Sequence, residues 1–258
     1  MFFSEWMGLV WIVGTIFVCF LTVAIGIIIA EWFGGEHAVA WIIGLQCAFQ
    51  ILIAFTSAQF VGLVLGGVTF ITIAGSLIYP TIELGANYLN EFYGLKVSRT
   101  SVNAQMVFRI LASLLLVFLF ILPFPPGFEK NNADFLSLNK IVPRITGASI
   151  IATWVTGLVM VYVYDLVRGW TKGEKLWLRS LSSNITSMIV NSILFVILAF
   201  AGVLSATLIA NMILIQILFK FIDSFLEVGF LYGLQALKAR GLLQRRGVVQ
   251  PATQPPSL

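Results

Sequence analysis

The sequence predicts an all-α integral membrane protein with about seven transmembrane helices. Of its 258 residues, 59% are apolar and only 10% are charged, whereas a soluble domain is nearer half apolar and a quarter charged. Apolar runs of about 20 residues are long enough to cross the hydrocarbon core of a bilayer. Seven such runs occur, roughly at Met7–Ala30, Ala38–Phe60, Val68–Glu91, Val102–Leu122, Ile145–Val167, Ser180–Val203 and Thr207–Ala236.

Basic residues are concentrated in one set of the loops between these runs. Ten lie after the third, fifth and seventh runs: Lys96, Arg99, Arg168, Lys172, Lys175, Arg179, Lys238, Arg240, Arg245 and Arg246. The other set of loops has only Lys130, Lys140 and Arg144, in or next to the longest connection, which we expect to be an ordered hairpin or partial lid at Pro123–Pro143. The positive-inside rule therefore predicts a multi-pass protein of the cell membrane, with the N-terminus outside and the C-terminus in the cytoplasm.

The stretch Tyr79–Arg99 is the most polar of the predicted spans. Its residues Glu83, Asn87 and Glu91 are four apart, which places them on one face of a helix. Pro80 interrupts the helix near its start. A charge at the bilayer centre costs roughly 2.5–3.5 kcal/mol on insertion scales. Such a face usually lines a cavity, so we predict that it forms the floor of a binding site.

Three later spans also have a polar stripe. Ser149 lies on the fifth span, Asn184 and Asn191 on the sixth, and Gln216 and Lys220 on the seventh. Small polar residues often serve only to pack helices together. Asn191 fits that interpretation poorly, because its amide needs both donor and acceptor partners near mid-membrane.

Two cations in the spans have alternative interpretations. Arg109 could extend its side chain back to the basic boundary or pair with Glu83 or Glu91. Lys220 could form a structural ion pair with acids of its own helix, Asp223 or Glu227, or it could act in function.

The residue types argue against catalysis and favour a small ligand. One histidine and two cysteines inside predicted spans leave little for metal or nucleophilic chemistry, so we expect no enzyme, no metal and no cofactor. No soluble surface remains for a nucleic acid. Amides and carboxylates can hydrogen-bond the edges of a flat ring, and aromatic residues such as Tyr79 can stack on its faces. A small heterocyclic base suits this set better than an ion or a sugar.

Three motifs resemble the queuosine precursor transporter family, also described as putative vitamin uptake transporters. They are the run YPTIELGANYLNEFYGLKVSR, the run VPRITGASIIATWVTG with Arg144, Ala148 and Ser149, and the run beginning LWLRSLSSN. Lys220-Phe221 also lies where the family has Lys-Phe in its last span. The resemblance covers roughly Ala38 to Ala236.

This resemblance implies uptake of a 7-deazaguanine base, preQ0 or preQ1, for tRNA modification. It also implies a six-helix transporter core, here residues 38–240, preceded by an additional helix and linker at residues 1–37 and followed by a disordered cytoplasmic tail at residues 241–258. The chain differs from the family pattern at Asn87 and Asn191, where the family has Asp. Losing these carboxylates favours a neutral ligand such as preQ0 over the cationic preQ1.

We therefore expect a cavity between the third, fifth, sixth and seventh spans. Asn87, Glu91 and Asn191 are assigned to the ring edges and Ser149 to a supporting bond, with Glu83, Tyr79, Asn184 and Gln216 as further binding candidates. Arg144, Lys220 and Arg109 are assigned to gating or charge balance. Two alternatives remain: a substrate-capture subunit of an ATPase-driven vitamin uptake system, and a non-transporting scaffold. The sequence leaves open whether the chain acts alone or as a homodimer.

Overall fold

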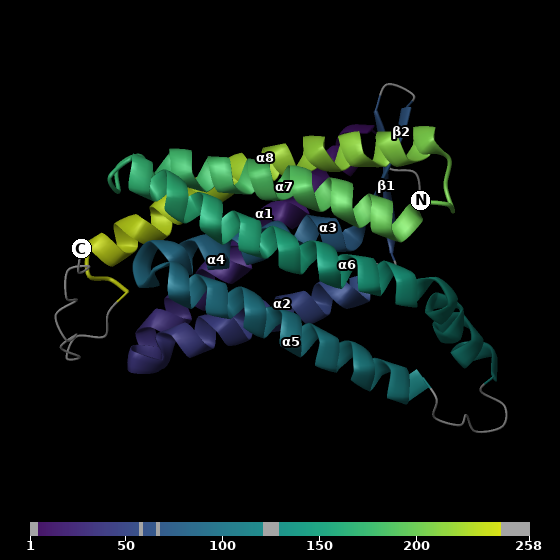
Figure 1. The fold of residues 1–258 in the computed structure, drawn as a ribbon, viewed down its shortest axis with the longest axis horizontal. Coiled ribbons are helices and arrows are strands. Elements are labelled where there is room, and N and C mark those ends of the chain that lie inside the picture. The colour runs from purple at the N-terminus through teal and green to yellow at the C-terminus, as the bar shows by residue number, and fades with distance from the viewer. Residues whose placement is uncertain (1–4, 57–58, 66–67, 121–128, 244–258) are drawn as a thin grey trace.

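Long helices make up most of the structure, a computed structural model that describes residues 5–56, 59–65, 68–120 and 129–243 (Figure 1). The elements in chain order are α1 (Glu5–Gly34), a short 3-10 turn (Gly35–His37), α2 (Ala38–Thr56), β1 (Phe60–Leu65), β2 (Val68–Ile73), α3 (Ala74–Ile78), α4 (Pro80–Tyr93), α5 (Leu95–Phe120), α6 (Glu129–Trp170), α7 (Leu176–Phe200) and α8 (Ala206–Ala239). Residues 244–258, most of the predicted tail, lie outside the described part.

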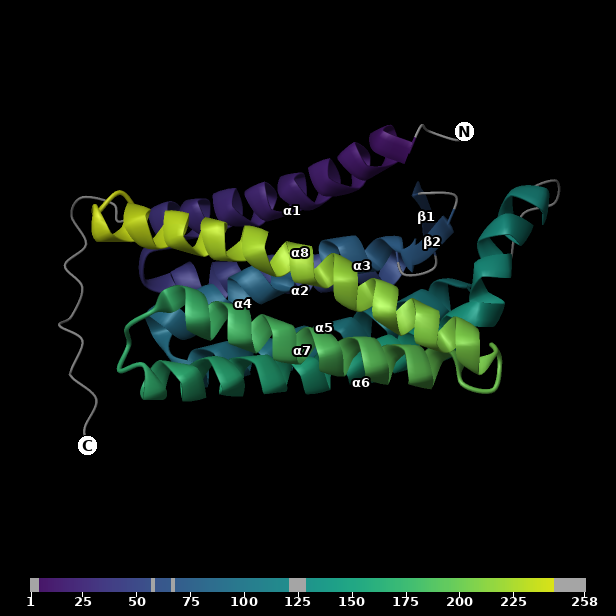
Figure 2. The same cartoon turned by 90° about the horizontal axis from the view of Figure 1, so that it is seen from above.

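Helices of membrane-spanning length confirm that the protein crosses a membrane more than once. Among the described residues, three stretches are long and apolar enough to do so: Val10–Ile53, Arg144–Trp170 and Leu176–Phe200. The first contains both α1 and α2, which are joined by the turn at Gly35–His37. Successive long helices run back and forth along one direction (Figure 2).

A β-hairpin begins at the last residue of the predicted second span and replaces the start of the predicted third span. Strands β1 and β2 pair antiparallel, with Phe60 opposite Ile73 and Leu65 opposite Val68. The prediction of one helix over Val68–Glu91 is therefore wrong in its first six residues. Periodicity cannot separate a short buried strand from a helix in a uniformly apolar run, and the Val, Thr and Ile that dominate β2 favour the strand.

Helix α4 lies at the centre of the bundle, as expected from its polar face. All residues from Pro80 to Asn90 are buried, and the helix contacts α1, α2, α5, α6 and α8. Pro80 occupies the first turn, where its missing N–H does no harm, and Tyr79 separates α4 from the short α3. At the other end the chain turns at Gly94, whose φ of 86° is accessible mainly to glycine.

Helix α6 is longer than the predicted fifth span. It begins at Glu129 rather than near Pro143–Arg144, so most of the predicted hairpin or lid at Pro123–Pro143 is helix, apart from residues that the structure does not describe. A proline inside a helix loses one hydrogen bond but does not forbid the helix.

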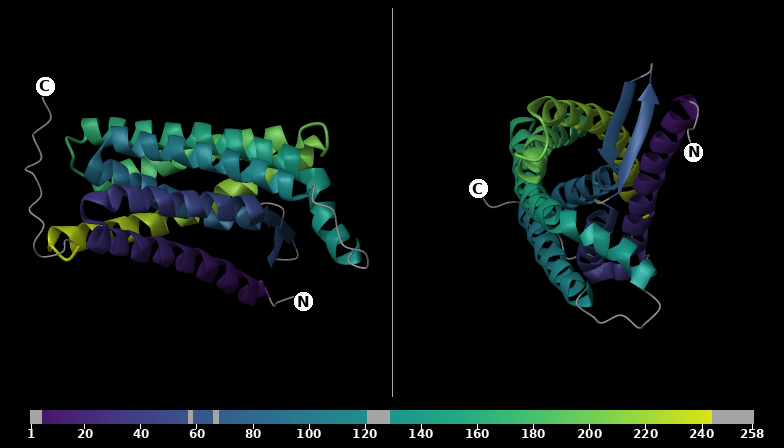
Figure 3. Two further views of the ribbon diagram at one scale, coloured as in Figure 1. Left: turned by 90° about the horizontal axis from the view of Figure 1, so that it is seen from below. Right: turned by 90° about the vertical axis from the view of Figure 1, so that its right-hand side faces the viewer.

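Helix α1 is fixed to the rest of the bundle at one end. Lys238 Nζ on α8 lies 2.8 Å from Glu31 Oε1 on α1, and the hydroxyls of Tyr88 and Tyr93 on α4 donate to the same oxygen at 2.6 and 2.8 Å. This group of four residues is called the Glu31 clasp below. α1 and α6 lie on opposite sides of the bundle (Figure 3).

Candidate functional site

A polar cavity lies where α3, α6, α7 and α8 meet. About 340 Å³ of space here is free of protein atoms, a figure that includes solvent at the open mouth of the cavity. It is lined by Ile53, Gly75, Ser76, Tyr79, Ser149, Thr153, Asn191, Phe195, Gln216 and Lys220. We call it the lysine cavity. Five of the predicted site residues line it, in the position that the sequence predicts between these spans.

Lys220 is the cation of this cavity. Its Nζ donates to Asn191 Oδ1 at 2.6 Å and lies 5.1 Å from the centre of the Tyr79 ring. Asn191 Nδ2 in turn donates to Thr156 Oγ1 at 3.2 Å. Lys220 therefore makes an interhelical bond to α7 and a cation–π contact, instead of the bonds to acids of its own helix that the sequence left open.

Gln216 lies one turn before Lys220 on the same face of α8. It is 3% exposed, and its Nε2 has no hydrogen-bond partner among the residues that the structure describes. A buried amide donor without a partner costs about 1–3 kcal/mol. Because Gln216 lines the cavity, an acceptor atom of a bound ligand would satisfy this donor.

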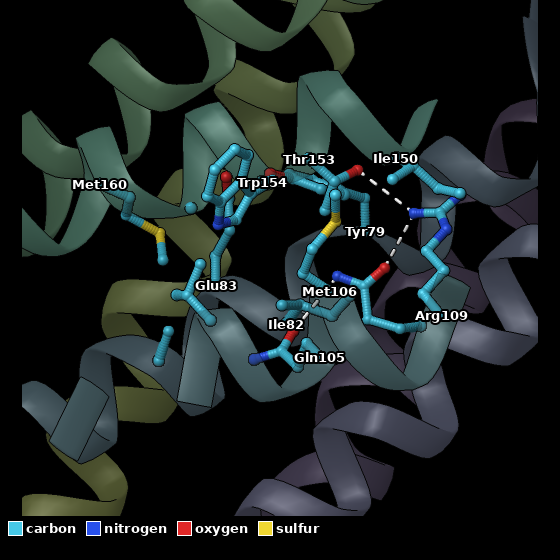
Figure 4. Close-up of a pocket in the computed structure, with 14 residues that line it drawn as sticks. Tyr79, Ile82, Glu83, Gln105, Met106, Arg109, Ile150, Thr153, Trp154 and Met160 are labelled. Atoms are coloured by element: carbon cyan, nitrogen blue, oxygen red, sulfur yellow. Dashed lines mark hydrogen bonds between the residues drawn. The ribbon is translucent and has the colours of Figure 1, made fainter. Parts of the chain in front are cut away.

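A second cavity lies between α2, α4, α5 and α6. It has about 390 Å³ of empty space, again partly open, and Arg109 lines it together with Gln105, Met106 and Trp154 (Figure 4). We call it the arginine cavity. Tyr79 and Thr153 line both cavities, so these two side chains form a shared wall.

Arg109 is held by neutral groups. It donates to Gln50 Oε1 at 2.9 Å, Thr153 Oγ1 at 3.3 Å and Ser149 Oγ at 2.7 Å, and it is only 1% exposed. The side chain thus neither extends to the basic boundary nor forms a salt bridge to Glu83 or Glu91. Ser149 Oγ accepts from Arg109, and the supporting bond to a ligand that the sequence assigns to Ser149 stays a prediction.

A polar cluster lies next to the cavities between α4, α7 and α8. Asn87 Nδ2 donates to Asn184 Oδ1 and to Glu227 Oε1, both at 2.8 Å, and Asn184 Nδ2 donates to Glu227 Oε2. Ser187 Oγ donates to Glu83 Oε1 at 2.8 Å. Among the predicted binding residues, Asn87 and Asn184 thus bind each other and Glu227, and neither lines the two cavities. Glu83 is shared, because it also lines the arginine cavity.

Two predicted residues lie elsewhere. Glu91 pairs with Arg179, with 2.6 Å between Oε1 and Nη2 and 3.0 Å between Oε2 and Nε, and it also accepts from Tyr164. Arg144 is exposed and donates to the carbonyls of Leu198 and Ala201 at the end of α7. Their roles in binding and gating stay predictions, and the geometry shows structural partners for both.

Sequence reasoning missed Arg179, Thr153 and Thr156 as site or support residues, and it treated Glu227 only as an ion-pair partner. Arg179 was visible as a basic residue in a family-like motif, but its pairing with Glu91 joins residues 88 positions apart, which no local spacing reveals. Among the described residues, no group of three or more His, Cys, Asp or Glu could hold a metal ion.

Membrane-length helices around buried polar cavities define a multi-pass membrane protein. Residues 73–234 match the family described as "Putative vitamin uptake transporter". The chain belongs to this family. It is also 28% identical over 160 residues to the "Probable queuosine precursor transporter" of Bacillus subtilis (strain 168), covering 61% of this chain and 69% of that protein. No solved structure shows significant similarity to it.

Proposed function

We propose that this protein carries a neutral 7-deazaguanine base, preQ0, across the cytoplasmic membrane as a precursor for tRNA modification, and that the base binds in the lysine cavity. The observation that carries the proposal is the lining of that cavity, which combines a cation, an unpaired amide donor and an aromatic ring. The similarity to a protein named as a queuosine precursor transporter supports the ligand class.

The lining favours a neutral, acceptor-rich ring over a cation. Lys220 Nζ and Gln216 Nε2 are donors that suit carbonyl and ring-nitrogen acceptors, and Tyr79 offers a ring for stacking. The ten described residues that line the cavity include no Asp or Glu. The aminomethyl group of preQ1 would meet the charge of Lys220 without a carboxylate partner, so preQ1 should bind more weakly.

Uptake and binding of preQ0 by the purified protein test this function. Proteoliposomes containing only this protein should take up radiolabelled preQ0, and binding in detergent should favour preQ0 over preQ1. Uptake that requires an added ATPase pair would instead identify a substrate-capture subunit. Absence of binding to either base would contradict the proposal.

Gln216→Leu should weaken preQ0 binding by about tenfold, because one hydrogen bond is worth roughly 0.5–1.5 kcal/mol. The melting temperature without ligand should stay the same or rise, since the Gln216 Nε2 atom has no protein partner to lose among the described residues and the cost of an unpaired buried donor is removed. Gln235→Leu, half-buried on the same helix and outside both cavities, is the matched control. Equal affinities for the two variants would place the ligand elsewhere.

We further propose seven membrane crossings, made by α1, α2, α3 with α4, α5, α6, α7 and α8. With the basic loops inside, the α6–α7 turn faces the cytoplasm and the α7–α8 turn faces outward. The two turns lie at opposite ends of the bundle (Figure 2).

Cysteine labelling checks this orientation. In a chain with Cys19 and Cys47 replaced by alanine, Glu174→Cys and Val203→Cys introduce exposed thiols in the two turns. A membrane-impermeant reagent added to intact cells should label position 203 and leave position 174 unlabelled until the cells are opened. The reverse pattern would invert the topology, and labelling of both in intact cells would rule out the seven crossings.

A further inference from the structure

Five buried charged side chains in the described part of the bundle have no salt bridge among them. They are Arg109 and Lys220, which are cationic, and Glu83, Asp223 and Glu227, which are acidic. All are 5% exposed or less. Two other buried charges of the described residues are paired, Arg179 with Glu91 and Glu31 with Lys238.

The five charges do not balance. Two cations and three ionised carboxylates leave one excess negative charge in a part of the bundle where charge is expensive. The repulsion between carboxylates that share a buried site falls when one of them stays protonated. The carboxylate of Glu83 interacts electrostatically with those of both Asp223 and Glu227. Because the five side chains carry one excess negative charge, a single added proton would make the set neutral.

Unpaired acceptor atoms point to the same missing proton. Asp223 Oδ1 is buried and has no hydrogen-bond partner among the described residues, and neither has Asn87 Oδ1. Asn87 is fully buried and touches Glu227 through its Nδ2 atom, so its unpaired oxygen belongs to the polar cluster. An acceptor with no donor is satisfied when a neighbouring carboxyl group carries a hydrogen.

Titratable and polar side chains from α1, α4, α5, α7 and α8 surround these acids. On α8 they are Lys220, Asp223 and Glu227, and from α1 Cys19 interacts electrostatically with Asp223. Glu83 lies on α4, and Tyr79 lies immediately before that helix. Tyr79 interacts electrostatically with Glu83 and with Arg109 of α5. The groups that α7 presents are Ser180, Ser183, Asn184 and Ser187, which do not titrate in the physiological range.

We propose that Glu83, Asp223 and Glu227 form a binding site for one coupling proton, which moves across the membrane together with each neutral base. This inference rests on the proposed function. The proton comes from water on one side, forms an O–H bond to one of the three carboxylates, and leaves to water on the other side. Lys220 connects the two sites, because it lines the base cavity and interacts electrostatically with both Glu83 and Asp223.

Proteoliposomes with a pH gradient test this inference on the wild-type protein. With the inside one pH unit more alkaline, and the membrane potential held at zero by valinomycin with equal potassium on both sides, preQ0 should accumulate about tenfold, the limit for one proton per base. A pH dye trapped inside should report one proton entering per base taken up. Exchange of labelled for unlabelled preQ0 without a gradient serves as the reference. Exchange without accumulation or acidification would overturn the proton site and leave the proposed function intact, whereas absence of exchange and binding would refute the function itself.

Two variants locate the site. Glu227→Gln and Asp223→Asn remove a titratable group at nearly constant volume, and each should reduce the accumulation ratio from about ten to about one at whatever exchange rate remains. Glu36→Gln, at an exposed acid in the turn after α1, should keep the wild-type ratio. Tenfold accumulation in both cluster variants would show that the coupling proton binds elsewhere.

Discussion

Lys220→Met should weaken preQ0 binding by at least tenfold. The change removes the Nζ donor that lies 2.6 Å from Asn191 Oδ1 and the cation above the Tyr79 ring. A hydrogen bond to a charged group contributes about 1.5–3 kcal/mol, and each 1.4 kcal/mol is a factor of ten in affinity. The affinity loss includes both the lost contact to the base and the loosened position of Asn191.

Matched variants separate this effect from a general loss of charge. Lys172→Met changes the same residue type in the exposed α6–α7 turn and should bind preQ0 normally. Lys220→Arg keeps the cation and should recover part of the affinity. Isothermal titration in detergent gives the preQ0 affinity of each variant, and melting curves show that each variant is folded. Wild-type affinity in a folded Lys220→Met protein would exclude the lysine cavity as the binding site.

Arg179→Gln should lower the free energy of unfolding by about 3–5 kcal/mol, since removing one partner of a buried ion pair leaves the other charge uncompensated. The side chains of Arg179 and Glu91 are 2% and 9% exposed, and their closest atoms are 2.6 Å apart. Arg179 also donates to the carbonyls of Gly173 and Glu174, so it connects the α6–α7 turn to α4. Arg99→Gln, at an exposed arginine, is the control and should have little effect.

A double-mutant cycle with Glu91→Gln decides between two roles for Glu91. If the pair is structural, Glu91→Gln also destabilises the protein, the double variant costs less than the sum, and the folded fraction binds preQ0 normally. The sequence-based assignment of Glu91 to the ring edge predicts instead an unchanged melting temperature and abolished binding. Denaturation and binding measured on the same four proteins separate these outcomes.

Much of the lysine cavity could be predicted from helix periodicity. Gln216 and Lys220 are four residues apart on α8, and polar residues in an apolar helix have few places to lie except the interior. The same logic predicted that Ser149 and Asn191 face the interior, whereas Tyr79 was proposed as an aromatic residue for stacking. Spacing within one helix gives the face, however, and does not tell which residue of a neighbouring helix lies opposite.

Contacts between helices lie beyond that limit. Glu91 and Asn87 share a face of α4, yet Glu91 meets Arg179 while Asn87 meets Asn184 and Glu227. Their partners depend on the level of α7 and α8 beside α4, which only the assembled bundle fixes. The hairpin was missed for a different reason: β1 is uniformly apolar and the two threonines of β2 are three residues apart, so the alternation of a half-buried strand was not visible.

The Glu31 clasp has a consequence for biosynthesis. Membrane helices are made in chain order, and Lys238 follows Glu31 by 207 residues. During nearly all of translation, the carboxylate of Glu31 has no lysine from α8, and α1 has no α8 to pack against. The clasp can therefore close only after the last helix has entered the bilayer. A chain that ends before Lys238 therefore leaves the carboxylate of Glu31 without its lysine partner.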